Sequence, residues 1–151
     1  MFSVTEYTNS KFIKIIESSD KFSAIEELAR VFEGTKVCSN VEALINALKE
    51  REEILSTGIG MGIAIPHAKV DAVKEMAFAI GISHKGIDFD SLDGHPARLM
   101  ILVAAGEGQH KEYLHLLSNI MAIIKNEKIK NTLIEAASPE TIMNILESKE
   151  N

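Results

Sequence analysis

The sequence predicts a layered α/β or α+β protein. Two continuous apolar runs, 76–82 and 99–105, have the length of strands that are buried on both sides. Segments before and after them carry apolar residues at helical spacing. A chain of 151 residues corresponds to one domain and is long enough to bury a substantial core. We therefore expect residues 1–151 to form a single domain in which helices cover a sheet.

The first third of the chain predicts one short apolar element and two helices. The segment 12–16 is too short for its type to be assigned by pattern, and a strand is one possibility. The cluster 18–20 is typical of a helix start, and the apolar residues of 25–32 repeat at helical spacing until Gly34. A second helix is expected to begin with its N-cap in 39–40.

This second helix carries a run of charged residues before it stops ahead of Gly58. Such runs usually form the solvated face of a helix, and we expect this of Glu50, Glu52 and Glu53. Arg51 lies close to the glycines that follow, so it retains a functional alternative.

The segment 56–69 is the most distinctive part of the chain. Its glycines, in 58–62, allow backbone conformations that a Cβ would block. The apolar run 63–65 leads to Pro66 and His67, and proline suits the end of a strand because it donates no backbone hydrogen bond. We therefore expect an imidazole presented at a strand end beside glycine backbone.

The rest of the chain predicts a turn and three helices. An Asp-Gly turn at 93–94 lies between the two long apolar runs. Helical spacing returns over 110–124 and again over 126–136. A last helix is expected with Ser138 as its N-cap and Pro139 at its first position.

Composition narrows the classes of function. The net charge of −6, with no cluster of Lys and Arg, argues against nucleic-acid binding. A single cysteine, Cys38, excludes an intrachain disulfide and fits a reducing compartment. With no apolar run of membrane-spanning length and no secretory leader pattern, we expect a cytoplasmic protein that does not insert into a membrane.

His67 is the leading candidate for chemistry, although a lone histidine is more often structural. Its ordinary pKa of roughly 6.5 leaves a neutral, nucleophilic nitrogen at cytoplasmic pH. If one ring nitrogen donates to a backbone carbonyl, the lone pair of the other is fixed outward. This arrangement suits nucleophilic attack on phosphorus.

Other templates do not fit. A dinucleotide-binding fingerprint would need glycine at Ile63, and no P-loop follows the glycines. His110 and His115 are five residues apart and face different sides of a helix, so we expect no metal site. Ser56 and Thr57 lack a nucleophile-elbow motif and are expected to offer hydroxyl hydrogen bonds near the site.

Residues 51–67, REEILSTGIGMGIAIPH, resemble the active-site signature of enzyme IIA of the fructose/mannitol class. This enzyme belongs to the phosphoenolpyruvate-dependent sugar phosphotransferase system, and the nitrogen-regulatory IIA proteins share the signature. The similarity continues through 86–94, GIDFDSLDG, and the apolar run 99–105, and covers most of the chain. The resemblance implies a mixed sheet sandwiched between helices.

The resemblance also implies roles for single residues. His67 matches the histidine that takes a phosphoryl group from HPr and passes it to a cysteine of a IIB component. Arg51 matches an arginine that stabilises phosphoryl charge. Tyr113 stands where the family commonly has a second histidine, and its hydroxyl can donate a hydrogen bond but carries no positive charge. His115, two residues on, would point to another side of the helix.

Three functions remain open on the sequence. The first is a phosphoryl relay in sugar uptake, from HPr through His67 to IIB. The second is a regulatory protein in which phosphorylation of His67 controls binding to a partner protein. The third is a binding domain that has lost the chemistry, for which Tyr113 is the only support. None of them calls for a metal or an organic cofactor, and each predicts an exposed apolar rim around His67.

Overall fold

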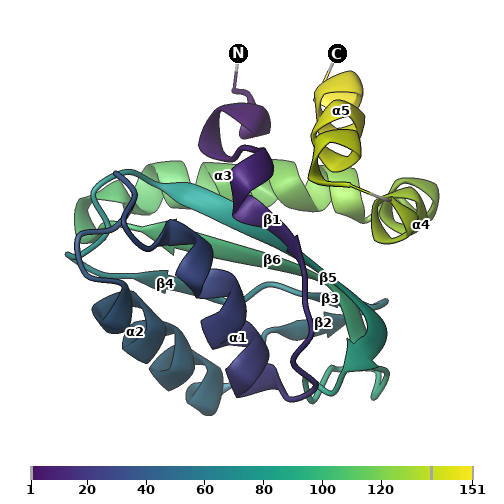
Figure 1. The fold of residues 1–151 in the computed structure, drawn as a ribbon, viewed down its shortest axis with the longest axis horizontal. Helices are drawn as coiled ribbons and strands as arrows, with labels where there is room; N and C mark the ends of the chain where they lie inside the picture. Colours follow the sequence, from purple (N-terminus) through teal and green to yellow (C-terminus); the bar gives the residue numbers. More distant parts are fainter. Residues whose placement is uncertain (1, 137, 151) are drawn as a thin grey trace.

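The computed structural model describes residues 2–136 and 138–150, and these residues fold around one mixed sheet (Figure 1). The strands lie in the order β1-β5-β6-β3-β2, and β4 also pairs with β6. Strands β5 and β6 are antiparallel, as are β2 and β3, whereas β1 runs parallel to β5 and both β3 and β4 run parallel to β6. The strands are β1 Ile13–Ile15, β2 Gly58–Gly60, β3 Ile63–Ala64, β4 His67–Lys69, β5 Ala77–Ile87 and β6 Ala97–Ala105. The expected α/β class and the mixed sheet are confirmed, and the ambiguous segment 12–16 contains a strand.

Helices cover both faces of this sheet (Figure 1). Among the described residues, no helix is both long and apolar enough to cross a membrane. The α-helices are α1 Lys21–Ala29, α2 Val41–Ile54, α3 His110–Ile124, α4 Glu127–Glu135 and α5 Pro139–Glu150. The short 3-10 helices are η1 Val4–Tyr7, η2 Ser10–Phe12, η3 Arg30–Phe32 and η4 Glu107–Gln109.

Side-chain caps fix where the predicted helices begin. The side chain of Asp20 accepts from the backbone N–H of the third residue of α1, and Asn40 does the same for α2. Ser138 caps α5 in the same way, with Pro139 at the first helical position. These bonds satisfy N–H groups that lack partners inside the helix, so the predicted helix starts are confirmed.

The central strand β6 divides the core into two layers. Met100, Leu102 and Ala104 pack with α1 and α2, whereas Leu99 and Val103 pack with α3, α4 and α5. This alternation follows from the two-residue period of a strand. The continuous apolar run 99–105 therefore is a strand covered on both faces, as the sequence predicts.

Strand β3 ends at Ala64, ahead of Pro66, and β4 begins at His67, so the expected strand end at the proline is confirmed. Ile63 of β3 is in register with Leu99, and His67 of β4 is in register with Val103, which is the same offset along β6. The carbonyl of Pro66 still accepts a hydrogen bond from Val103 N at 3.0 Å. Because proline loses its N–H and not its carbonyl, Pro66 separates the two strands and still contacts β6. His67 therefore begins β4, on the face of the sheet toward α3.

Candidate functional site

His67 lies half-buried on β4, between α2 and α3, and its ring orientation is fixed by the backbone. Its Nδ1 lies 2.8 Å from the carbonyl oxygen of Ile65. Because a carbonyl only accepts, this contact places the ring proton on Nδ1 and leaves the lone pair on Nε2. Burial is the largest influence on the pKa of His67 and lowers it below the ordinary 6.5, and the charges of Arg51 and Lys69 act in the same direction. The ring is therefore a neutral nucleophile at neutral pH.

Two hollows open beside His67. The larger has a volume of about 510 Å³ and lies between α2, β4 and α3. The smaller has a volume of about 330 Å³ and is bordered by the segment that follows α2 and by α3. Arg51 and His67 line both, so they lie where the hollows meet. The larger is completed by Ala47, Glu50, Ile54, Ala68, Lys69 and Tyr113, and the smaller by Ser56, Thr57, Ile59, Ile65, Leu117 and Met121.

Two cations at the larger hollow have no carboxylate partner within ion-pair distance among the described residues, although Glu50 also lines it. Arg51, in the last turn of α2, donates from Nη1 to the carbonyl of Leu55 at 2.8 Å. Lys69 places its Nζ 2.5 Å from Nδ1 of His110. An anion that enters this hollow meets both positive charges.

Tyr113 reaches the same hollow from α3. Its ring centroid lies 5.8 Å from that of His67, and Lys69 Nζ lies 5.2 Å from the Tyr113 ring. Burial raises the pKa of Tyr113 to about 12, while the charge of Arg51 acts against this shift. The hydroxyl therefore stays protonated and is able to donate a hydrogen bond.

His115 lies outside this site. Its exposed ring packs against Phe2, with ring centroids 4.8 Å apart, and it lines neither hollow. His115 therefore lies on another side of the helix from Tyr113, as its two-residue offset predicts, and the geometry gives it no place in the site.

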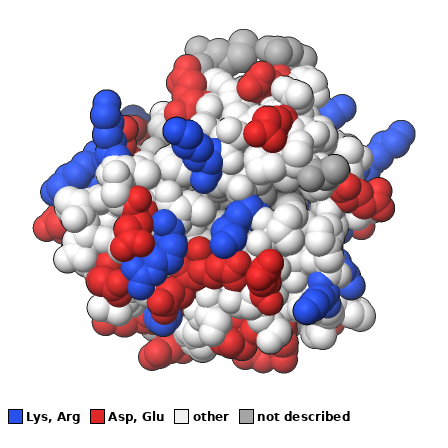
Figure 2. Space-filling model, in the orientation of Figure 1, with Lys and Arg blue, Asp and Glu red and all other residues white. Residues whose placement is uncertain are grey.

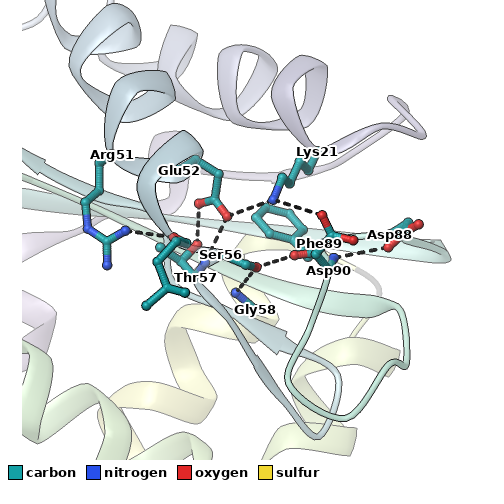
Figure 3. Close-up of polar contacts among 10 residues, drawn as sticks. Lys21, Arg51, Glu52, Ser56, Thr57, Gly58, Asp88, Phe89 and Asp90 are labelled. Atoms are coloured by element: carbon teal, nitrogen blue, oxygen red, sulfur yellow. Dashed lines mark hydrogen bonds and ion pairs between the residues drawn. The ribbon is translucent and has the colours of Figure 1, made fainter.

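Ser56 and Thr57 border the smaller hollow, but their hydroxyls are engaged inside the protein (Figure 3). The Ser56 hydroxyl donates to the carbonyl of Phe89 and accepts from Gly58 N at 3.0 Å. The Thr57 hydroxyl donates to Glu52 at 2.6 Å. Gly58 has no room for a side chain, because a Cβ there would lie 3.0 Å from Phe89 Cβ. These residues hold the segment that leads from α2 into β2.

The expectation that Glu52 is solvated is wrong. Glu52 is 2% exposed, and its carboxylate accepts from the backbone N–H and the hydroxyl of Thr57 and from Lys21 Nζ (Figure 3). Glu50 and Glu53 are exposed, as expected. The charge run conceals the difference, because only the path of the chain after the helix brings Thr57 back to Glu52.

Sequence reasoning also missed Lys69 and His110. Lys69 had a signal, since residues i and i+2 of an extended segment share a face and His67 is two residues earlier. His110 had none, because its contact with Lys69 joins α3 to β4. No group of three His, Cys, Asp or Glu side chains within 2–136 and 138–150 is placed to hold a metal ion.

The charges elsewhere on the molecule are mixed. Figure 2 shows Lys and Arg side chains lying among Asp and Glu side chains, with no continuous basic area on that face. Together with the net charge of −6, this gives no support for a nucleic-acid surface there.

A mixed sheet sandwiched between helices, with a backbone-oriented histidine facing unpaired cations at the sheet edge, defines a domain suited to receiving an anionic group. Residues 6–149 match the family described as "Phosphoenolpyruvate-dependent sugar phosphotransferase system, EIIA 2". The chain belongs to this family.

Two relatives show how the chain compares with named proteins. It is 40% identical over 144 residues to a fructose-specific EIIABC component of Bacillus subtilis, covering 95% of this chain and 23% of the relative. It is 43% identical over 107 residues to a fructose-specific EIIA component of Haloferax volcanii, covering 70% of this chain and 68% of the relative. The chain thus spans less than a quarter of the length of the Bacillus relative.

Solved structures share the fold. Nitrogen regulatory protein IIA-Ntr of Neisseria meningitidis superposes with a TM-score of 0.87 at 27% identity, covering 95% of this chain and 98% of that one. The mannitol enzyme IIA of Escherichia coli, solved in complex with phosphorylated enzyme IIB, has a TM-score of 0.79 at 19% identity, covering 93% and 97%. At that identity the second likeness concerns the fold alone.

Proposed function

We propose that residues 1–151 form a single phosphoryl-carrier domain, which accepts a phosphoryl group from HPr on His67 and passes it to a cysteine of a IIB component. The observation that carries the proposal is the orientation of the ring. The Nδ1–H bond to Ile65 leaves the Nε2 lone pair free beside Arg51 and Lys69, for which the described residues supply no carboxylate partner. We expect this relay to operate in the cytoplasm and to require no metal or organic cofactor.

Each transfer exchanges one bond to phosphorus for another. First, the Nε2 lone pair of His67 forms a P–N bond while the P–N bond to the histidine of HPr breaks, and the HPr nitrogen keeps that electron pair. Second, the IIB thiolate forms a P–S bond while the P–Nε2 bond breaks and returns its electron pair to Nε2. Nδ1 keeps its proton throughout and donates it in the hydrogen bond to the Ile65 carbonyl, so no base is needed to remove that proton.

The neighbouring side chains stabilise the charge that moves. Arg51 and Lys69 face the phosphoryl oxygens from two elements, and charge-assisted hydrogen bonds of this kind are the strong ones. Tyr113 donates from its protonated hydroxyl. Ser56 and Thr57 support the site by holding the backbone before β2, since their hydroxyls are already engaged.

Protein partners would dock on apolar residues around His67. Ile54 is 79% exposed and Ile59 is 37% exposed, and each lines one of the hollows. Leu55, 65% exposed, lies between them in the sequence. We propose this exposed apolar rim as the surface that HPr and IIB share, with nearby charges setting the register.

A regulatory role is the second candidate, and it is favoured by the similarity to IIA-Ntr. In that role the same phosphorylation of His67 controls binding to a partner protein. The chemistry on His67 is common to both functions, so only the protein that responds to the phosphorylated state separates them.

The test is the intact mass of the full chain after incubation with phosphoenolpyruvate, enzyme I and HPr. We expect a gain of one acid-labile phosphoryl group, absent from His67→Ala and retained in His115→Ala, whose ring lies outside the site. Absence of the gain in the unaltered chain, or its persistence in His67→Ala, contradicts the proposal. Loss of the label to an added IIB protein then supports the relay, and retention of it supports the regulatory role.

A further inference from the structure

Glu52 is a buried acid next to the site with no part in the transfer steps. Removing a carboxylate from water is costly unless hydrogen bonds and an opposite charge compensate for it. Here three donors do so: Thr57 N at 2.8 Å, Thr57 Oγ1 at 2.6 Å and Lys21 Nζ at 3.3 Å (Figure 3). The backbone N–H and the hydroxyl of Thr57 both donate to the Glu52 carboxylate, so the position of Thr57 depends on Glu52.

Hydrogen bonds continue from Thr57 to the imidazole. The carbonyl of Thr57 accepts from Ile65 N at 3.0 Å. The carbonyl of Ile65 in turn accepts from Nδ1 of His67 at 2.8 Å. Glu52 is thus connected to the ring proton of His67 through two backbone segments.

The other end of this connection is held by α1 and by the loop after β5. Lys21 lies between the carboxylates of Glu52 and Asp90, the latter at 3.7 Å (Figure 3). The carbonyl of Phe89, next to Asp90, accepts a hydrogen bond from the Ser56 hydroxyl. Three separate parts of the chain therefore converge on the segment that precedes β2.

We propose that Glu52 is a positioning residue, which holds Thr57 and thereby the Ile65 carbonyl that decides which ring nitrogen of His67 carries the proton. Without Glu52, the Thr57 backbone loses its anchor, the Ile65 carbonyl shifts, and Nδ1 no longer has a fixed acceptor. The proton then exchanges between the two nitrogens, and the Nε2 lone pair is available for only part of the time. The inference rests on the proposed function for the chemistry at His67, whereas its geometric part stands without it.

The experiment compares Glu52→Gln with a matched control, Glu27→Gln. Glu27 of α1 also accepts from backbone N–H groups, a hydroxyl and a lysine, but it lies beside the segment after β1, at the opposite edge of the sheet from β4. The readout is the ¹⁵N spectrum of His67 in the full, unphosphorylated chain, which distinguishes Nδ1–H from Nε2–H rings. A second readout is the rate of phosphorylation by HPr.

We expect the unaltered chain and Glu27→Gln to hold the Nδ1–H form. Glu52→Gln should give a mixture of the two forms and phosphorylate on the order of 10–100-fold more slowly. The proposal is overturned if the His67 spectrum and the phosphorylation rate of Glu52→Gln equal those of the unaltered chain. It is also overturned if Glu27→Gln lowers the phosphorylation rate as much as Glu52→Gln does.

Two further arms keep the outcome decisive. If Glu52→Gln does not fold, Thr57→Val removes only the hydroxyl donor, and it should shift the His67 spectrum in the same direction by a smaller amount. An unshifted spectrum in folded Thr57→Val overturns the proposal. If HPr fails to phosphorylate the unaltered chain, the proposed function fails, while the spectrum still decides whether Glu52 orients the ring.

Discussion

The two edges of the sheet each contain an acid that holds a chain segment, and they differ in how the nearby cations are used. At the β1 edge, Glu27 accepts from Glu17 N, from Ser18 N and Oγ, and from Lys14. At the β4 edge, Glu52 accepts from Thr57 and Lys21 in the same manner. The same combination of donors therefore fixes a turn of the backbone in both places.

The cations beside α1 are paired, whereas those beside His67 are not. Lys14 pairs with Glu27, while Arg30 and Lys49 both pair with Glu26. At the other edge, Arg51 and Lys69 have no carboxylate partner in the described parts of the chain. Paired cations contribute to the stability of the fold, and unpaired ones remain available to an incoming anion, so charge pairing separates the structural edge from the edge that we propose to be reactive.

Truncating the two acids should give the largest difference between the edges. We expect Glu52→Ala to cost about 3–5 kcal/mol in the free energy of unfolding, because it leaves both Thr57 donors without a partner in the interior and Lys21 with only its longer contact to Asp90. Glu27→Ala should cost about 1.5–3 kcal/mol, since its site is partly open to water that replaces the lost acceptor. Urea unfolding of both variants measures the difference, and equal losses would show that burial does not distinguish the two acids.

The acid sensitivity of the structural edge should follow Glu27. Burial by itself would raise the pKa of Glu27, but the hydrogen bonds from Ser18 and Glu17 and the contact with Lys14 lower it from 4.5 to about 2. Between these values the unfolded chain binds more protons than the folded one, so this contribution to stability is complete above pH 4.5 and is lost as the pH falls toward 2.

Glu27→Gln removes that contribution, which we expect to be about 1.5–3 kcal/mol at neutral pH. Unfolding followed from pH 7 to pH 2 should show a smaller fall in stability for the variant than for the unaltered chain. A variant whose curve runs parallel to that of the unaltered chain would mean that Glu27 is not the titrating group.

Removing one lysine from each edge should separate rate from stability. We expect Lys69→Met to slow phosphorylation of His67 on the order of tenfold, the equivalent of about 1.4 kcal/mol, because one of two charges beside the phosphoryl group is lost. Its stability should change by less than about 0.5 kcal/mol, as for exposed groups. Lys14→Met should leave the rate unchanged and lower stability slightly. A slower rate in Lys14→Met together with an unchanged rate in Lys69→Met would refute the contrast in charge pairing.

The smallest effect should come from the tyrosine hydroxyl. Tyr113→Phe keeps the ring beside His67 and removes one neutral donor, a loss of about 0.5–1.5 kcal/mol in the transition state. Phosphorylation should therefore slow by roughly twofold to tenfold, with little change in urea unfolding. Tyr7→Phe, far from β4 in the sequence and absent from both hollows, is the control. An unaltered rate in Tyr113→Phe would assign Tyr113 to packing alone.

Local sequence determined the elements of the fold and the centre of the site. Asp20, Asn40 and Ser138 each cap a helix through a residue three positions away, so a short window contains the whole interaction. The run 99–105 needed only its apolar composition to be assigned as a central strand. His67 and Arg51 were identified from one contiguous segment and its resemblance to a family.

Tertiary structure decided the environment of that centre. The sequence placed Glu52 among solvated charges, and it is buried because Thr57 and Lys21, which lies 31 residues before it, supply its donors. The sequence predicted a strand end at Pro66, but only the tertiary structure shows that β3 before it and β4 after it both pair with β6. A cap depends on neighbours along the chain, whereas the burial of a charge and the pairing of a strand depend on donors that only folding brings within hydrogen-bond distance.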